Sequence, residues 1–154
     1  MNNSSHVVVF ACNWDGLSCI EAAAHEGLSY PASVRVVRVS CLSRVHLGLI
    51  LRAFELGAEG VMLLGCEPGE CNYDKDPHDI AREYEKAQGL LRLMGMAPEK
   101  VTLSNMSRGN GVSFVHKVNE FVAQVGGLPR PVPAAEAGKR ETKQPSAWRF
   151  RIEG

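Results

Sequence analysis

"GVMLLGCEPGECNY", residues 60–73, joins an apolar run to a turn that carries two cysteines. The apolar run before Cys66 predicts a buried strand, because a continuous apolar segment bounded by turn residues is typical of parallel sheets. Pro68 and Gly69 predict a tight turn directly after that strand. The stretch therefore indicates a buried strand that ends at Cys66, followed by a loop that carries Cys71.

Strand-like runs alternate with helix-like segments on both sides of this stretch. Strands are expected at residues 6–12, 34–41, 60–66 and 100–106, and helices at 15–26, 44–57, 77–94 and 111–126. Such alternation predicts right-handed βαβ units around a parallel sheet. We therefore expect an α/β fold for residues 1–131: a small doubly wound parallel sheet, flavodoxin-like, with an extended C-terminal arm.

The charge balance excludes some classes of partner. The chain has 154 residues, with 17 Lys and Arg against 17 Asp and Glu, so its formal net charge is zero. Bulk charge thus gives no reason to expect a nucleic-acid partner. There is no transmembrane run, and the N-terminus lacks the basic region of a signal peptide. We expect a cytoplasmic protein without membrane insertion.

The composition changes after Gly126. The following residues are rich in Pro and Ala and then charged, without apolar periodicity, so residues 132–154 are predicted to form an arm. Its last stretch, "AWRFRIEG", alternates Trp148, Phe150 and Ile152 with arginines, as a strand or a partner-docking segment would. A disordered terminus is an equally weighted interpretation.

The cysteines are the candidate site residues. There are five of them, all in the first half of the chain: Cys12, Cys19, Cys41, Cys66 and Cys71. An odd number in a cytoplasmic protein argues against a pure disulfide framework. Cys12, Cys41 and Cys66 end the first three expected strands. Because the carboxyl ends of parallel strands share one edge of a sheet, we expect these three thiols and Cys71 to converge there.

Four converging thiolates suit an iron–sulfur cluster or a tetrahedral zinc ion. Structural zinc usually relies on tight C-x2–4-C pairs, whereas here a single C-x4-C pair is joined by thiols from separate strands. This spread set fits a two-iron, two-sulfur (2Fe-2S) cluster somewhat better. A zinc-stabilised structural adaptor subunit without a redox role is the alternative. A thiol–disulfide enzyme using Cys66 and Cys71 is less favoured, because the usual redox dithiol is C-x-x-C.

The remaining candidates have simpler interpretations. Cys19 lies within the expected first helix, roughly 10 Å along it from Cys12, so it is interpreted as a buried core thiol and only as an alternative ligand. Asp15 begins that helix and is interpreted as its N-cap. No Ser-His-Asp set or carboxylate pair stands out, so no catalytic residue is predicted.

Four segments together carry a family resemblance: "FACNW", "RVVRVSCLSR", "GAEGVMLLGCEPGECNY" and "KVNEFV". Over about residues 7–131 they resemble the methyl-viologen-reducing hydrogenase delta subunit family. The resemblance implies a non-catalytic subunit of a larger oxidoreductase complex, with a 2Fe-2S cluster held by Cys12, Cys41, Cys66 and Cys71. Its implied role is to relay electrons between a hydrogenase, or another electron-input subunit, and a heterodisulfide reductase-type subunit that carries flavin and iron–sulfur centres.

One departure from the family pattern bears on the ligand set. Typical members continue "CNWC", whereas this chain has "CNWD", so Asp15 stands in place of a cysteine. Cys19 follows one helical turn later. Whether Cys19 takes over a role of the replaced cysteine is left open by the sequence.

Overall fold

The computed structural model describes residues 5–128, and the predicted arm at residues 132–154 lies outside them. The strands are β1 (Val7–Cys12), β2 (Val34–Val39), β3 (Gly60–Cys66) and β4 (Val101–Met106), and the α-helices are α1 (Asp15–His25), α2 (Leu47–Glu55), α3 (Pro77–Leu93) and α4 (Gly111–Gly127). Short 3-10 helices span Leu42–Arg44 and Pro98–Lys100. The predicted alternation of strands and helices is confirmed.

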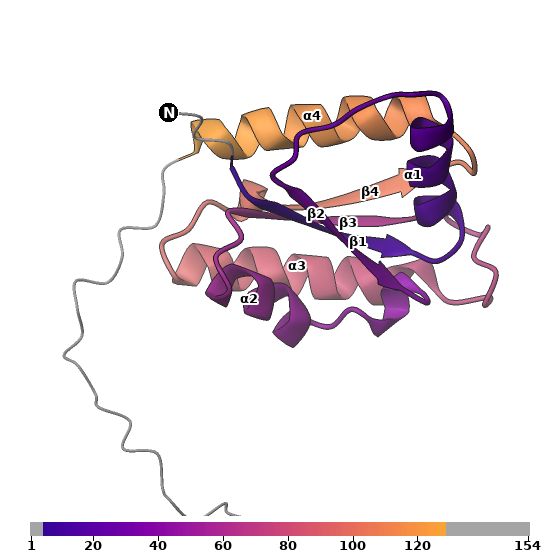
Figure 1. The fold of residues 1–154 in the computed structure, drawn as a ribbon. Coiled ribbons are helices and arrows are strands. Elements are labelled where there is room, and N and C mark those ends of the chain that lie inside the picture. Colours follow the sequence, from indigo (N-terminus) through magenta and orange to yellow (C-terminus); the bar gives the residue numbers. More distant parts are fainter. Residues whose placement is uncertain (1–4, 129–154) are drawn as a thin grey trace, which may run out of the picture.

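The sheet is parallel throughout, with the strand order β2-β1-β3-β4. Helices α1 and α4 cover one face, and α2 and α3 cover the other (Figure 1). This confirms the doubly wound α/β fold. The order equals the first four positions of the flavodoxin-type order 2-1-3-4-5. Because residues 5–128 contain no fifth strand, the closer likeness to flavodoxins stays a prediction.

Each face of the sheet has its own hydrophobic core. In β1, Val7 and Val9 pack toward α1 and α4, whereas Phe10 and Cys12 pack toward α2 and α3. A strand buried on both faces cannot show polar alternation, and this explains the continuous apolar runs in the sequence. Cys19 lies in the first core, so the two cysteines nearest the N-terminus are on opposite faces of the sheet.

The second expected strand is shorter than predicted. Instead of running to Cys41, β2 ends at Val39, where its pairing with β1 stops at the pair Cys12–Val39. Within residues 5–128, β2 is an edge strand that pairs with β1 alone, so no second neighbour there extends it. Cys41 follows in extended backbone with φ −153° and ψ 149°. It still leaves the sheet at the carboxyl edge.

The second expected helix is also interrupted. The prediction was one helix over residues 44–57, but a 3-10 turn at Leu42–Arg44 comes first, and α2 begins only at Leu47. Leu42 and Val45 are both buried in the core of the α2 and α3 face. Val45 adopts extended backbone, which breaks the helix while burying its side chain.

Within residues 5–128, no helix is both long enough and apolar enough to span a membrane.

Candidate functional site

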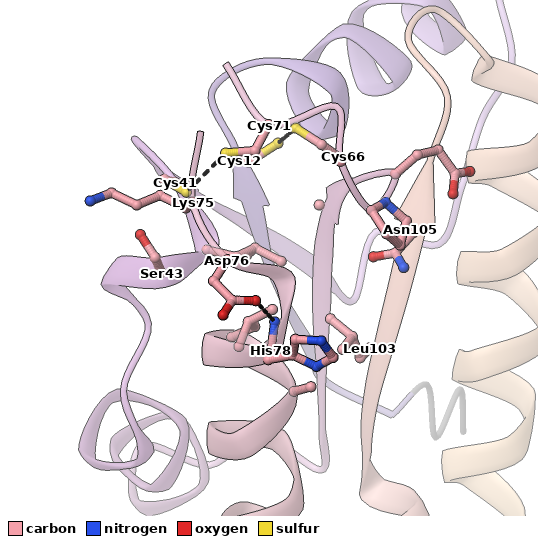
Figure 2. A pocket seen from close by; sticks show the side chains of 17 residues that line it. Cys12, Cys41, Ser43, Cys66, Cys71, Lys75, Asp76, His78, Leu103 and Asn105 are labelled. Carbon is pink, nitrogen blue, oxygen red and sulfur yellow. Dashed lines mark hydrogen bonds between the residues drawn. The ribbon is translucent and has the colours of Figure 1, made fainter. Parts of the chain in front are cut away.

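A cavity of about 290 Å³ lies at the carboxyl edge of the sheet. Its walls come from the segments that follow β1, β2 and β3, together with the start of α3 and part of β4. Cys12, Cys41, Cys66 and Cys71 all line it, and Cys19 is not among its lining residues. Figure 2 shows the four cysteines gathered at its upper end, above His78. The structure therefore brings together the four thiols that the sequence predicted to converge.

The four thiols are arranged as two pairs. The sulfur atoms of Cys12 and Cys66 lie 3.6 Å apart, and those of Cys41 and Cys71 lie 3.8 Å apart. No disulfide joins any of the five cysteines. Two thiolates bound to one tetrahedral metal through bonds of about 2.3 Å lie roughly 3.8 Å from each other. Each pair therefore already has the spacing of two ligands on one metal ion.

This arrangement does not form a single-ion site. Within residues 5–128, no group of three or more His, Cys, Asp or Glu side chains is placed to hold one metal ion. A structural zinc needs four ligands around one centre. A 2Fe-2S cluster instead shares its four thiolates between two irons. The four thiols thus supply thiolate donors in two pairs, a donor type that suits a thiolate-bound metal centre.

Two consecutive turns shape the loop that carries Cys71. The N–H of Glu70 donates to the carbonyl of Glu67 at 3.0 Å, and Gly69 has a φ of +85°. Pro68 followed by a glycine at positive φ is the pattern of a type II turn, and the tight turn predicted from the sequence is confirmed. The N–H of Asp74 then donates to the carbonyl of Cys71 at 3.0 Å. The loop thereby returns Cys71 to the side of Cys41.

The Cys12 and Cys66 pair lies against the N-terminus of α1. The N–H of Gly16 donates to the sulfur of Cys12 at 3.1 Å. Burial raises the pKa of Cys66 to about 12, the neighbouring Cys12 thiol also acts to raise it, and the backbone N–H of Asp15 acts in the opposite direction. In the metal-free protein, Cys66 is therefore protonated at neutral pH.

Cys71 has the opposite electrostatic character. Burial raises its pKa, but the backbone N–H groups of Lys75 and Tyr73 and the thiol of Cys41 outweigh this effect, so the pKa of Cys71 is lowered overall. Hydrogen bonds to the charged form stabilise a thiolate. The Cys41 and Cys71 pair is therefore the half of the site where a thiolate forms more readily.

Asp15 does not cap α1, so that prediction is wrong. Trp14 occupies the N-cap position without a side-chain hydrogen bond, and Asp15 is the first residue of the helix. Its carboxylate, 3% exposed, accepts a hydrogen bond from Nε of Arg108 at 2.8 Å. Sequence reasoning did not identify Arg108. Its one usable signal was its place just after β4, at the same edge of the sheet as the cysteines.

Cys19 lies away from the cavity. Its side chain is fully buried in the core beneath α1 and α4, and its thiol donates to the carbonyl of Ser107 at 3.1 Å. Burial raises the pKa of Cys19, which favours the neutral thiol. These surroundings are those of a structural core residue, and whether Cys19 is a ligand stays a matter for experiment.

Further residues around the site have no clear signal in the sequence. Lys75, Asp76 and His78 line the cavity from the segment that enters α3. Trp14 and Tyr73 make an edge-to-face contact with ring centroids 6.2 Å apart, and both are partly exposed. Each of these aromatic residues follows a site cysteine by two positions. Their contact joins the β1–α1 and β3–α3 loops beside the thiols.

Comparison with known proteins gives a consistent family. The family model described as "Methyl-viologen-reducing hydrogenase, delta subunit" matches residues 7–128. The iron-sulfur D subunit of the F420-non-reducing hydrogenase of Archaeoglobus profundus is 35% identical over 120 residues, covering 78% of this chain and 88% of the relative. The iron-sulfur D subunit of the F420-non-reducing hydrogenase vhu of Methanopyrus kandleri is 37% identical over 121 residues, covering 79% of this chain and 92% of the relative.

A second kind of relative is much longer. The A subunit of the Ferredoxin/F(420)H(2)-dependent CoB-CoM heterodisulfide reductase of Methanosarcina acetivorans is 29% identical over 119 residues, covering 77% of this chain but only 15% of the relative. A segment similar to this chain therefore occurs both as a separate protein and within a much longer heterodisulfide reductase polypeptide.

Proposed function

The chain belongs to the methyl-viologen-reducing hydrogenase delta subunit family, and we propose that it is a non-catalytic electron-transfer subunit carrying one 2Fe-2S cluster. The observation that carries the proposal is that four thiols line one cavity as two pairs. The sulfur atoms are 3.6 Å apart within the Cys12 and Cys66 pair and 3.8 Å apart within the Cys41 and Cys71 pair. The names of the relatives, which call them iron-sulfur subunits, support it as well.

The geometry suggests a division of the ligands. Cys12 and Cys66 would hold one iron, and Cys41 and Cys71 the other, because each pair has the spacing of two thiolates on one metal. When bound, a 2Fe-2S cluster held by these thiolates would supply one-electron transfer. The chain contributes the thiolates, the N–H donors of α1 and a largely apolar cavity wall.

The partners follow from the family and from the longer relative. Because a similar segment lies within a heterodisulfide reductase polypeptide, a direct contact with a heterodisulfide reductase-type flavin and iron–sulfur subunit is supported. On this proposal the chain receives electrons from a hydrogenase, or another electron-input subunit, and passes them to that partner. Anaerobic purification of the native complex should recover these subunits together, whereas a functional lone monomer would count against the assembly.

The alternative function is a zinc-stabilised structural adaptor subunit. It requires all four thiolates around one ion. Because the thiols of residues 5–128 form two pairs and no group placed to hold one ion, the geometry favours it less. The same family membership would suit either function, so the metal content decides between the two.

The test is metal analysis with single alanine replacements of the cysteines. The full-length protein, purified without oxygen, should be brown, should contain iron and acid-labile sulfide, and should give an EPR signal after reduction with dithionite. Replacing Cys12, Cys41, Cys66 or Cys71 should abolish or badly perturb that signal, whereas Cys19→Ala should keep it. A colourless protein that contains zinc would overturn the proposal. Loss of the signal in Cys19→Ala, with retention in Cys12→Ala, would assign the helix thiol as a ligand instead.

A further inference from the structure

An ion pair between a buried carboxylate and an exposed guanidinium lies beside one half of the proposed cluster site. Asp15 and Arg108 are 2.8 Å apart, and the carboxylate is 3% exposed. The backbone N–H of the same Asp15 acts on Cys66, as does its charge. The pKa of Arg108 is raised chiefly by its hydrogen bond with Asp15, and the charge of Cys66 adds to that effect. Asp15 directly precedes Gly16, whose N–H donates to the sulfur of Cys12 at 3.1 Å, so the ion pair lies beside the Cys12 and Cys66 half of the site.

The loop that carries Arg108 is fixed to α1 at three consecutive residues. The carbonyl of Ser107 accepts from the Cys19 thiol at 3.1 Å, and the N–H of Gly109 donates to Oγ of Ser18 at 2.9 Å. Arg108, between them, bonds Asp15. Because its neighbours on both sides are held by the same helix, the guanidinium has a defined position relative to the site, although its side chain is 59% exposed.

The charges of this pair have opposite effects on a nearby redox centre. Reduction of a thiolate-bound cluster adds one negative charge to the site. A buried carboxylate disfavours that added charge, and a neighbouring guanidinium favours it. Without Arg108, the carboxylate of Asp15 would be a buried charge without its cation beside the thiolates, which is unfavourable.

We propose that Asp15 and Arg108 set the reduction potential of the cluster, with Arg108 making the site easier to reduce and Asp15 holding the guanidinium in position. This inference rests on the proposed function. Asp15 is here the positioning residue, and Arg108, which is not among the residues that line the cavity, acts through its charge.

The experiment measures midpoint potentials by EPR-monitored redox titration of the full-length, cluster-loaded protein at fixed pH and ionic strength. R108Q should shift the potential to more negative values, and R108K, which keeps the charge, should stay closer to the wild type. D15N should shift it to more positive values. The double variant D15N/R108Q should lie nearer to the wild type than R108Q, because it removes both charges. The R108Q shift should shrink at high salt, since Arg108 is exposed.

A matched control removes a similar ion pair elsewhere. Arg52 is 62% exposed and bonds Glu55 at 2.9 Å near the end of α2, and it does not line the cavity. R52Q should leave the potential unchanged. If Arg108 has only a structural role, R108Q should alter the yield or stability of the protein, and the variants should not show the expected order of midpoint potentials.

The outcomes separate the inference from the proposed function. If the wild type shows no iron–sulfur signal, the proposed function fails. If the cluster is present and R108Q keeps the wild-type potential, this inference is overturned. If R108Q does not bind the cluster, the midpoint potential of D15N is the test. A D15N potential equal to or more negative than the wild-type potential overturns the inference.

Discussion

The sulfur atoms of Cys12 and Cys66 lie 3.6 Å apart although the two residues are separated by 54 positions in the chain. They meet because β1 and β3 are adjacent in the sheet and both strands end at the same edge. The contact therefore depends on how α1 and the central strands pack together, and this dependence can be tested without touching a cysteine.

Gly16 allows α1 to approach the sheet closely. A Cβ at this position would lie 2.7 Å from the carbonyl oxygen of Leu64 and 3.3 Å from the sulfur of Cys12. Gly16→Ala should therefore push the helix away and lower both the iron content and the free energy of unfolding, the latter by about 1–3 kcal/mol. Iron analysis and urea denaturation measure the two effects.

Gly89→Ala is the matched control for this substitution. Gly89 lies within α3, and a Cβ there would meet nothing within 4 Å. Alanine should raise the free energy of unfolding by up to about 1 kcal/mol through helix propensity and leave the iron content unchanged. Equal responses at Gly16 and Gly89 would show that close approach at Gly16 is unimportant.

The thiols of the metal-free protein should differ in reactivity. The pKa of Cys71 is lowered, whereas the pKa of Cys66 is raised to about 12 and that of Cys19 is raised by burial. A lowered pKa increases the thiolate fraction near neutral pH, and the thiolate is the nucleophile. Iodoacetamide should therefore modify Cys71 first, as measured by mass spectrometry of the peptides, and Cys66 should stay slow as the pH rises toward about 9. Equal rates at Cys66 and Cys71 near neutral pH would contradict this order.

Cys19 should matter for stability rather than for iron binding. Cys19→Ala removes a fully buried sulfur atom and its hydrogen bond to Ser107. The free energy of unfolding should fall by about 1–2 kcal/mol, because a small cavity is left behind and the carbonyl of Ser107 keeps only its hydrogen bond from the N–H of Asn110. Chemical denaturation measures the change. If Cys19→Ala folds but contains no iron, Cys19 is a ligand of the metal centre.

The C-terminal arm should be separable from the domain. Residues 5–128 contain all four strands of the sheet and a hydrophobic core on each of its faces, so we expect deletion of residues 132–154 to leave folding and iron content unchanged. If the arm docks on a partner, the deletion should weaken assembly with co-expressed subunits in size-exclusion chromatography. Trp148→Ala tests the same contact with a smaller change. Unimpaired assembly in both variants would show that the arm is dispensable.

The convergence of four thiols could be predicted because it depends on a general rule. In a parallel sheet every strand ends at the same edge, so Cys12, Cys41 and Cys66 needed only correctly assigned strands. The expected strand over residues 34–41 was too long, because β2 ends at Val39. Cys41 nevertheless lines the cavity, so the predicted convergence of the thiols did not depend on this boundary. The tight turn at Pro68 and Gly69 could also be predicted, because it depends on the backbone preferences of these two residues alone.

The pairing of the thiols and the role of Asp15 could not be predicted in this way. Which cysteines pair depends on the strand order and on loop conformations, neither of which follows from spacing. Asp15 has a strong local preference for capping, but its partner, Arg108, lies 93 positions away in the chain. A long-range ion pair of this kind overrides a local propensity and leaves no pattern in a single sequence.

The distribution of the four thiols over separate loops also fixes the order in which a loaded protein can be made. In an unfolded chain only Cys66 and Cys71 are neighbours, so the ligand set exists only after β1, β2 and β3 have paired. If the chain carries the proposed 2Fe-2S cluster, folding precedes cluster insertion, and the folded metal-free protein already holds two thiol pairs with sulfur atoms 3.6 Å and 3.8 Å apart. On the proposed function, the supply of assembled cluster to the folded chain therefore limits how much of the protein can transfer electrons.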